Sequence, residues 1–143
     1  MKPYEIVDHT ADVRLKVNGA TLKELFENAA KGMFAIIRDE GIVKDAKSSE
    51  RRIIEIKKEA DDFETLLVDW LGEVLYTINK ENIFCTNFKI LELNNNGVRG
   101  EVYGKKIDPA KNKFQTEIKA VTFHELKIEE QAKGFSCAII FDV

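Results

Sequence analysis

Two segments of the chain each carry one apolar stripe at helical spacing, and this feature constrains the fold more than any other. The first stripe consists of Leu22, Leu25, Phe26, Ala29, Ala30, Met33, Phe34 and Ile37. The second consists of Phe63, Leu66, Leu67, Trp70, Leu71, Val74, Leu75 and Ile78. Alternating steps of three and one predict two amphipathic helices, each buried on one side only. The opposite side of the first helix carries Lys23, Glu27, Lys31 and Arg38, which we expect in solvent.

The remaining segments follow the two-residue period of strands. Val13, Leu15 and Val17 alternate with charged residues, and residues 83–93 and 98–107 flank a hairpin signal at Asn96-Gly97. Gly100 within the second of these segments points to a bulge or a close approach of the backbone. We therefore expect an α+β fold, a two-layer sandwich with both helices packed on one face of a largely antiparallel sheet. Residues 1–143 contain no repeat or linker, which predicts a single domain.

Charge and cysteine content exclude several classes of protein. A formal net charge of −3 and a pI near 5.5 argue against a chain that grips nucleic acid through a broad basic surface. The two cysteines form neither a CxxC pair nor a disulfide framework, which is typical of a reducing compartment. No secretory leader and no apolar run long enough to span a membrane is found in the sequence. We expect a cytoplasmic protein without a membrane partner.

The densest polar cluster, Asp8-His9-Thr10-Ala11-Asp12, lies between two predicted strands. Its carboxylates suit a hard cation, which prefers several oxygen ligands. The same residues can form a general acid–base pair. They can also form an Asx-type turn in which the carboxylates accept from local amides.

The other end of the sequence adds two carboxylates. Asp142 follows an apolar strand, and the α-carboxylate of Val143 is its neighbour. If this strand lies near Asp8 and Asp12, three or four negative charges meet, which without a cation pushes protons onto the carboxylates. Oxygen ligands of this kind favour Ca²⁺ or Mg²⁺ over Zn²⁺.

A third polar segment, Lys119-Ala120-Val121-Thr122-Phe123-His124, reads as a strand with Lys119 and His124 on opposite faces. A structural and a functional role remain open for both residues, as they do for Asp8 and His9. No nucleophile elbow or phosphate-binding glycine loop is present. We therefore expect no catalytic residues and no enzymatic activity.

These segments resemble the archease family. The resemblance is carried by residues 8–13 (DHTADV), the capped helix start at 21–30, residues 119–126 (KAVTFHEL) and the closing Asp142-Val143. It covers the chain almost from end to end. Where the family commonly has Tyr, this chain has Phe123.

The resemblance implies a function. Archeases, the family that this chain resembles, are small proteins that activate the RtcB-type RNA ligase. This ligase joins the exon halves of tRNA after intron removal. They promote guanylation of the ligase, allow multiple turnover and broaden its use of nucleoside triphosphates. The resemblance implies contact with tRNA only through the ligase. The implied metal ligands are Asp12, Asp142 and the Val143 carboxylate, with Ca²⁺ as the usual ion and Mg²⁺ as the alternative. Two other hypotheses stay open: a metal-dependent hydrolase using Asp8, His9 and Asp12, and a chaperone-like binding module for RNA-processing proteins.

Overall fold

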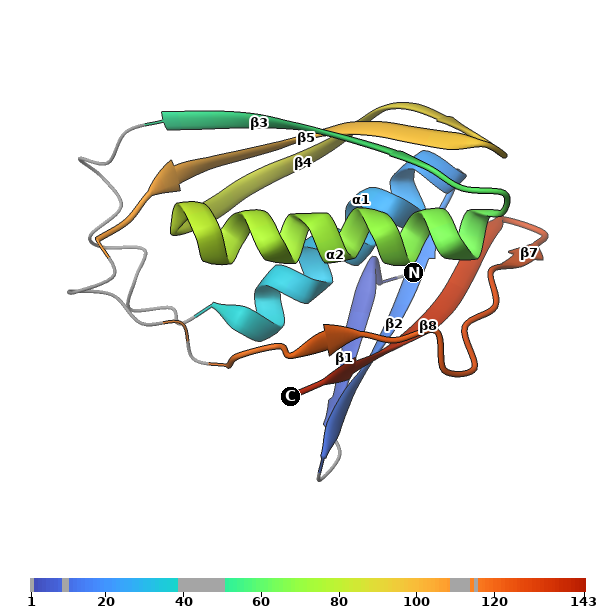
Figure 1. Cartoon of the computed structure of the whole chain (residues 1–143). Helices are drawn as coiled ribbons and strands as arrows, with labels where there is room; N and C mark the ends of the chain where they lie inside the picture. Colours follow the sequence, from blue (N-terminus) through green and yellow to red (C-terminus); the bar gives the residue numbers. More distant parts are fainter. Residues whose placement is uncertain (1, 9–10, 39–50, 109–113, 115) are drawn as a thin grey trace.

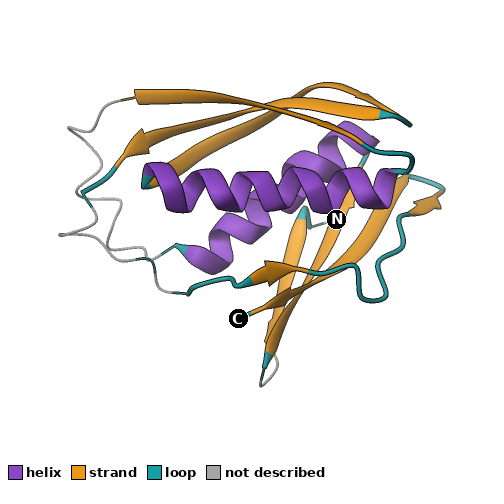
Figure 2. Cartoon of the chain, viewed as in Figure 1, coloured by secondary structure: helices purple, strands orange, loops and turns teal. Residues whose placement is uncertain are grey.

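Two antiparallel sheets enclose the two helices of the chain (Figures 1 and 2). The structure is a computed structural model that describes residues 2–8, 11–38, 51–108, 114 and 116–143. The elements in order are β1 (Tyr4–Asp8), β2 (Asp12–Gly19), α1 (Leu22–Ile37), β3 (Arg51–Glu59), α2 (Phe63–Glu81), β4 (Ile83–Asn94), β5 (Gly97–Lys106), β6 (Ala120–Val121), β7 (Glu129–Gln131) and β8 (Gly134–Asp142).

One sheet, here called the terminal sheet, joins the first and last strands of the fold. Its strand order is β1-β2-β8-β6, and β7 also pairs with β8. All its pairings are antiparallel, and β2 runs beside β8 over its whole length. Val13, Leu15 and Val17 point to the helices and are buried, as their alternation predicts.

The second sheet, the central sheet, has the order β3-β5-β4 and is also antiparallel. Its edge strand β3 is tied to α2 by ion pairs on either side of Ile56. The Arg52 guanidinium lies 3.0 Å from the Glu81 carboxylate, and the Lys58 ammonium lies 3.1 Å from the Glu73 carboxylate. These half-exposed ion pairs add to the packing of the central sheet on α2.

The helices begin and end where their capping residues place them. The Thr21 hydroxyl accepts from the Glu24 amide at 3.1 Å, and the Asp62 carboxylate accepts from the Thr65 amide at 2.7 Å. The second helix ends at Asn82, which adopts a left-handed conformation with φ 52°. Both helix starts therefore follow from local chemistry.

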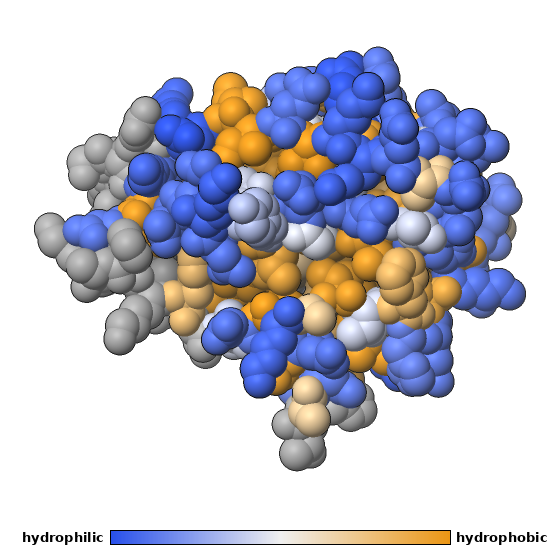
Figure 3. All heavy atoms as spheres, in the orientation of Figure 1, coloured by the Kyte–Doolittle hydropathy of each residue, from blue (hydrophilic) through white to orange (hydrophobic). Residues whose placement is uncertain are grey.

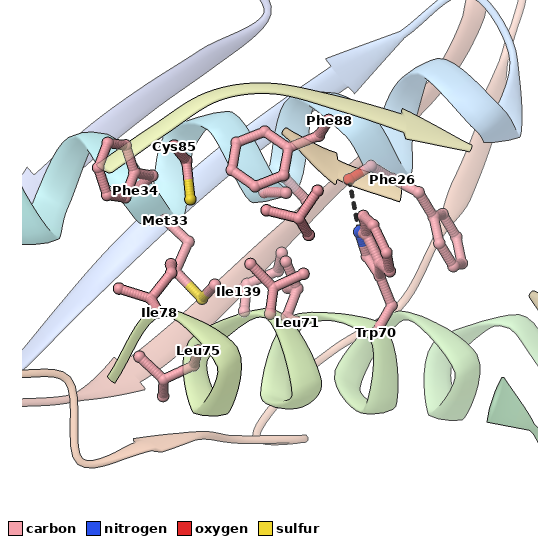
Figure 4. Close-up of a cluster of buried hydrophobic side chains, with 14 of the residues drawn as sticks. Phe26, Met33, Phe34, Trp70, Leu71, Leu75, Ile78, Cys85, Phe88 and Ile139 are labelled. Atoms are coloured by element: carbon pink, nitrogen blue, oxygen red, sulfur yellow. Dashed lines mark hydrogen bonds between the residues drawn. The ribbon is translucent and has the colours of Figure 1, made fainter. Parts of the chain in front are cut away.

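The core lies between the sheets and around both helices. Trp70 of α2 is fully buried, and its indole N–H donates to the Phe26 carbonyl of α1 at 3.1 Å (Figure 4). Figure 4 also shows Met33 of α1, Ile78 of α2 and Ile139 of β8 pointing into the same cluster. Trp70 thus joins the two helices through a buried hydrogen bond.

The α+β class and the packing of both helices on antiparallel sheet are confirmed. The expected single sheet is divided in two, so that the helices lie between sheets instead of covering one face of one sheet. The physical reason is that the apolar stripe of α1 is wide, so that the helix packs apolar side chains against both sheets. Its buried residues include Leu25 and Ile36, and the small residues Ala29, Ala30 and Gly32 between them are buried as well.

The polar side of α1 differs from expectation at Glu27, which is half-buried, and its exposed Lys23 also makes a contact with the backbone of β4. The Glu27 carboxylate accepts from the Ile90 amide at 2.8 Å, and the Lys23 ammonium donates to the Leu91 carbonyl at 3.2 Å. Both contacts fall where β4 departs from regular pairing, between Ile90 and Glu92. A bulge leaves backbone groups of β4 without hydrogen-bond partners on the neighbouring strand, and the side chains of Glu27 and Lys23 serve as those partners.

Hydrophobic side chains reach the surface beside α2. Figure 3 shows them as a band across this face of the molecule, with hydrophilic residues above and below. Among the described residues, neither helix has the length and apolar character needed to cross a membrane.

Candidate functional site

The pairing of β2 with β8 places Asp12 directly opposite Asp142. The two residues are register partners at the end of the ladder, and the adjacent pair is Val13 with Phe141. Val13 and Phe141 are buried against the helices. Because successive side chains of a strand alternate between faces, Asp12 and Asp142 both lie on the outer face of the terminal sheet. Asp12 is half-buried and Asp142 is exposed.

Two carboxylates in this position form an anionic site. Like charges directly opposite each other in an antiparallel pair are destabilising, and a hard cation between them relieves the repulsion. Val143 follows Asp142 and packs partly against the core, which fixes the position of the residue that bears the third expected ligand. The donor chemistry therefore fits Ca²⁺ or Mg²⁺, although these oxygens do not complete a shell of six to eight ligands.

No larger cluster of ligands surrounds the pair. Within the described ranges, no group of three or more His, Cys, Asp or Glu side chains is arranged to hold a metal ion. The predicted ligands are two such side chains, Asp12 and Asp142, and the main-chain carboxylate of Val143, so they do not form a group of three side chains. Any remaining ligands must come from backbone oxygens, from water or from a partner.

Asp8 is placed apart from the pair. It is the register partner of Val13, whose side chain faces the helices. Residues directly opposite each other share a face of the sheet, so Asp8 belongs to the inner face and Asp12 to the outer one. His9 lies outside the described residues. The register thus separates Asp8 from Asp12, which the acid–base hypothesis requires to act together.

The segment from Lys119 to His124 borders the same site. The Lys119 amide donates to the Asp142 carbonyl at 2.7 Å, and Ala120 is the register partner of Asp142. This brings the Lys119 backbone beside the carboxylate pair. The Thr122 hydroxyl donates to the Ile140 carbonyl at 2.9 Å and accepts from the His124 amide at 3.3 Å, which shapes the turn that follows β6.

An arginine that the sequence reasoning missed completes this surface. Arg14 lies on the outer face two residues along β2 from Asp12, and its Nη2 is 3.5 Å from Oε2 of Glu125. The Nε of Arg14 is buried and has no hydrogen-bond partner among the residues that the structure describes. Glu125 also lies 3.9 Å from Nε2 of His124. The alternation of residues 13–17 could have identified Arg14, because it assigns this side chain to the face of Asp12.

The two cysteines are unsuited to nucleophilic chemistry. Both are buried, and burial raises the pKa of Cys85. Burial, with a smaller effect from the Glu64 carboxylate, raises the pKa of Cys137 to about 12. A thiol with such a raised pKa holds little thiolate at neutral pH.

A hollow of about 680 Å³ lies in a different part of the molecule, between the end of β3 and the β4–β5 hairpin. Lys58 and Arg99 line it, but Lys58 is paired with Glu73 and Arg99 with Glu92 at 3.0 Å. These ion pairs neutralise Lys58 and Arg99, and Lys57 is a third cation in the lining. The carboxylate pair at the end of the terminal sheet is therefore the stronger candidate site.

Fold and site define a small α+β protein that presents paired carboxylates at one end of an antiparallel sheet. The model of the archease protein family matches residues 4–143. The protein archease of Methanosarcina acetivorans is 37% identical over 99% of this chain and 97% of its own. The protein archease of Pyrococcus furiosus is 36% identical over 94% of this chain and 93% of its own. The chain belongs to the archease family.

Solved structures agree with this assignment. The solution structure of Methanobacterium thermoautotrophicum protein 1598 matches with a TM-score of 0.76 and 34% identity, and the match covers all of both chains. The crystal structure of an archease from Thermotoga maritima, described as a possible chaperone, matches with a TM-score of 0.62. At 23% identity, over 96% of this chain and 94% of that one, the second match supports the fold alone.

Proposed function

We propose that this protein is a non-catalytic activator of an RtcB-type RNA ligase in the cytoplasm. It promotes the step in which a ligase histidine takes the guanylyl group of GTP and pyrophosphate leaves. It thereby supports multiple turnover and broadens the nucleoside triphosphates that the ligase accepts. Family membership over residues 4–143 supports this role, which is the one that the family resemblance implies. The ligase holds the tRNA, and this chain meets tRNA only through the ligase.

The observation that carries the proposal is the register of Asp12 opposite Asp142. It supports a divalent-cation site formed by these two side chains and the Val143 carboxylate, with Ca²⁺ favoured and Mg²⁺ as the alternative. When bound, the cation supplies a positive charge that can attract phosphate oxygens. The residues of this chain hold the ion at the surface, where a partner can reach it.

The geometry favours an activator over a hydrolase. A metal-dependent hydrolase needs a base beside the metal-bound water, and Asp8 belongs to the opposite face of the sheet from Asp12. Neither cysteine is a usable nucleophile, because both are buried with raised pKa. The chain supports activation by binding a ligase conformation more tightly than the resting one.

Multiple-turnover ligation by the cognate ligase tests the proposal. We expect this protein, in sub-stoichiometric amounts, to raise both the number of turnovers and the guanylated fraction of the ligase. Asp12→Asn and Asp142→Asn should weaken Ca²⁺ binding and activation together, whereas Asp61→Asn, at an exposed residue of another surface, should change neither. Residues added after Val143 should mimic the two site variants, and residues added before Met1 should not.

Three results would contradict the proposal. The first is equal turnover by the ligase with and without this protein. The second is hydrolysis of GTP or RNA by the isolated protein in Mg²⁺ or Mn²⁺, which would favour the hydrolase hypothesis. The third is binding to several unrelated RNA-processing proteins with no effect on ligation, which would favour a chaperone-like module.

A further inference from the structure

The turn after β6 holds a large hydrophobic side chain out in solvent. Phe123 is 54% exposed, whereas Val121 before it and Leu126 after it pack against the core. Large apolar side chains on a protein surface are common singly, so exposure alone decides nothing. What distinguishes Phe123 is how firmly its backbone is held and what surrounds it.

Four hydrogen bonds hold this turn. The Thr122 amide and hydroxyl both donate to the Ile140 carbonyl, at 3.1 and 2.9 Å. The Thr122 hydroxyl accepts from the His124 amide at 3.3 Å, and the Leu126 amide donates to the Phe123 carbonyl at 2.9 Å. The position of the Phe123 backbone is therefore set by contacts on both of its sides.

Glu125 adds strain to this turn. Its φ of 56° lies in the left-handed region, which is uncommon for a residue with a side chain. That conformation accompanies the contact of the Glu125 carboxylate with Arg14 on β2. The turn is thus anchored across the outer face of the terminal sheet, beside the strand that carries Asp12.

The two other strongly exposed hydrophobic residues lack this setting. Tyr76, 56% exposed on α2, has the Lys80 ammonium 5.6 Å from its ring centroid. Ile53, 63% exposed, lies on β3, an edge strand lined with charged residues that discourage pairing with another chain. Of these three residues, Phe123 is the one whose turn is bonded to β8, the strand that carries Asp142.

We infer that Phe123 is the hydrophobic anchor through which this protein docks on the RtcB-type ligase, an inference that rests on the proposed function. An exposed aromatic side chain with a polar rim has the chemistry of an interface hot spot. The rim here includes the exposed Glu125 carboxylate, two residues along the same turn, and acidic groups of this kind complement a basic partner surface. An enzyme that binds RNA has such a surface, because it must neutralise phosphates. The partner supplies an apolar pocket for the ring beside that basic surface.

Paired measurements of affinity and turnover test this anchor. We expect Phe123→Ala to raise the Kd for the ligase about 10- to 100-fold and to lower activation at limiting protein concentration. Tyr76→Ala, which removes an equally exposed ring elsewhere, should leave the Kd within about twofold. Phe123→Tyr keeps the ring and should bind nearly as the parent does. Thermal unfolding and Ca²⁺ titration of each variant show whether fold and ion site are intact.

The outcomes separate the two hypotheses. If the parent protein neither binds nor activates the ligase, the proposed function and the anchor both fail. If the parent activates and Phe123→Ala has the same Kd and the same turnover, the anchor alone fails. Tight binding of single-stranded RNA by the isolated protein, lost in Phe123→Ala, would also overturn the anchor, because the ring would then stack on bases. A net charge of −3 argues for the protein partner.

Discussion

Replacing Asp142 by Asn should change stability with opposite sign in the absence and presence of calcium. In a chelator, Asp142→Asn removes one of two like charges that face each other across β2 and β8. Such opposed charges destabilise a strand pair by about 0.2–1 kcal/mol, and the exposure of Asp142 favours the lower end. The variant should therefore be slightly more stable than the parent. The isosteric amide keeps the shape of the side chain, so packing contributes little to the difference.

In calcium the order should reverse. An ion that binds only the folded parent stabilises it by RT ln(1 + [L]/Kd), about 2.7 kcal/mol when the free ion is at 100 times Kd. The variant lacks one anionic ligand and should lose most of this gain. The parent should then be about 2 kcal/mol more stable than the variant, since the lost gain exceeds the relieved repulsion.

Guanidinium chloride unfolding at 25 °C, followed by circular dichroism, measures both differences. Each protein is unfolded once in chelator and once in Ca²⁺ at matched ionic strength. A variant that is less stable than the parent in chelator would refute the repulsion argument. An equal calcium gain in both proteins would refute the assignment of Asp142 as a ligand. Asp61→Asn serves as the control and should show the full calcium gain.

Three further changes test the fold. Gly100→Ala should destabilise the fold by about 1–3 kcal/mol, because the added Cβ would lie 2.9 Å from Cζ3 of Trp70. Gly72→Ala in α2 should stabilise the fold by up to about 1 kcal/mol, because its Cβ would meet nothing within 4 Å. Urea unfolding of both variants measures the two effects. Trp70→Phe should destabilise by about 2–4 kcal/mol through lost volume and the lost bond to α1, and an unchanged midpoint would contradict this. The Thr65 amide lowers the pKa of Asp62 from its ordinary 3.8, so the stability that Asp62 contributes is present above that pKa and lost as pH falls through the lower folded value. The stability difference between the parent and Asp62→Ala should therefore shrink below about pH 4, and a constant difference down to pH 2 would refute the assignment.

Both helices could be predicted from the sequence because their signals are local. The apolar stripes begin at Leu22 and Phe63, and the structure begins α1 and α2 at these residues, each directly after its capping residue. The strands differ. Alternation shows which residues share a face, but it does not show which strand pairs with which, so the division into two sheets could not be predicted.

The same distinction applies to the candidate site. The charges of Asp12 and Asp142 could be singled out from their strands, but their register is a long-range fact that only the pairing of β2 with β8 shows. Arg14 was overlooked because a charged residue on an outer face is usually a solvated one. Glu27 was expected in solvent because sequence does not reveal where β4 departs from regular pairing.

The pairing of β2 with β8 also determines when, during synthesis of the chain, the two carboxylates can come together. The two strands are separated by nearly the whole length of the chain, and β8 is the last strand of the fold to leave the ribosome. Pairing of such distant segments comes late in folding, because a long loop must close before the contact forms. A nascent chain therefore carries Asp12 without its partner, and only the finished fold presents both carboxylates. A surface assembled in this way forms only after synthesis has passed β8.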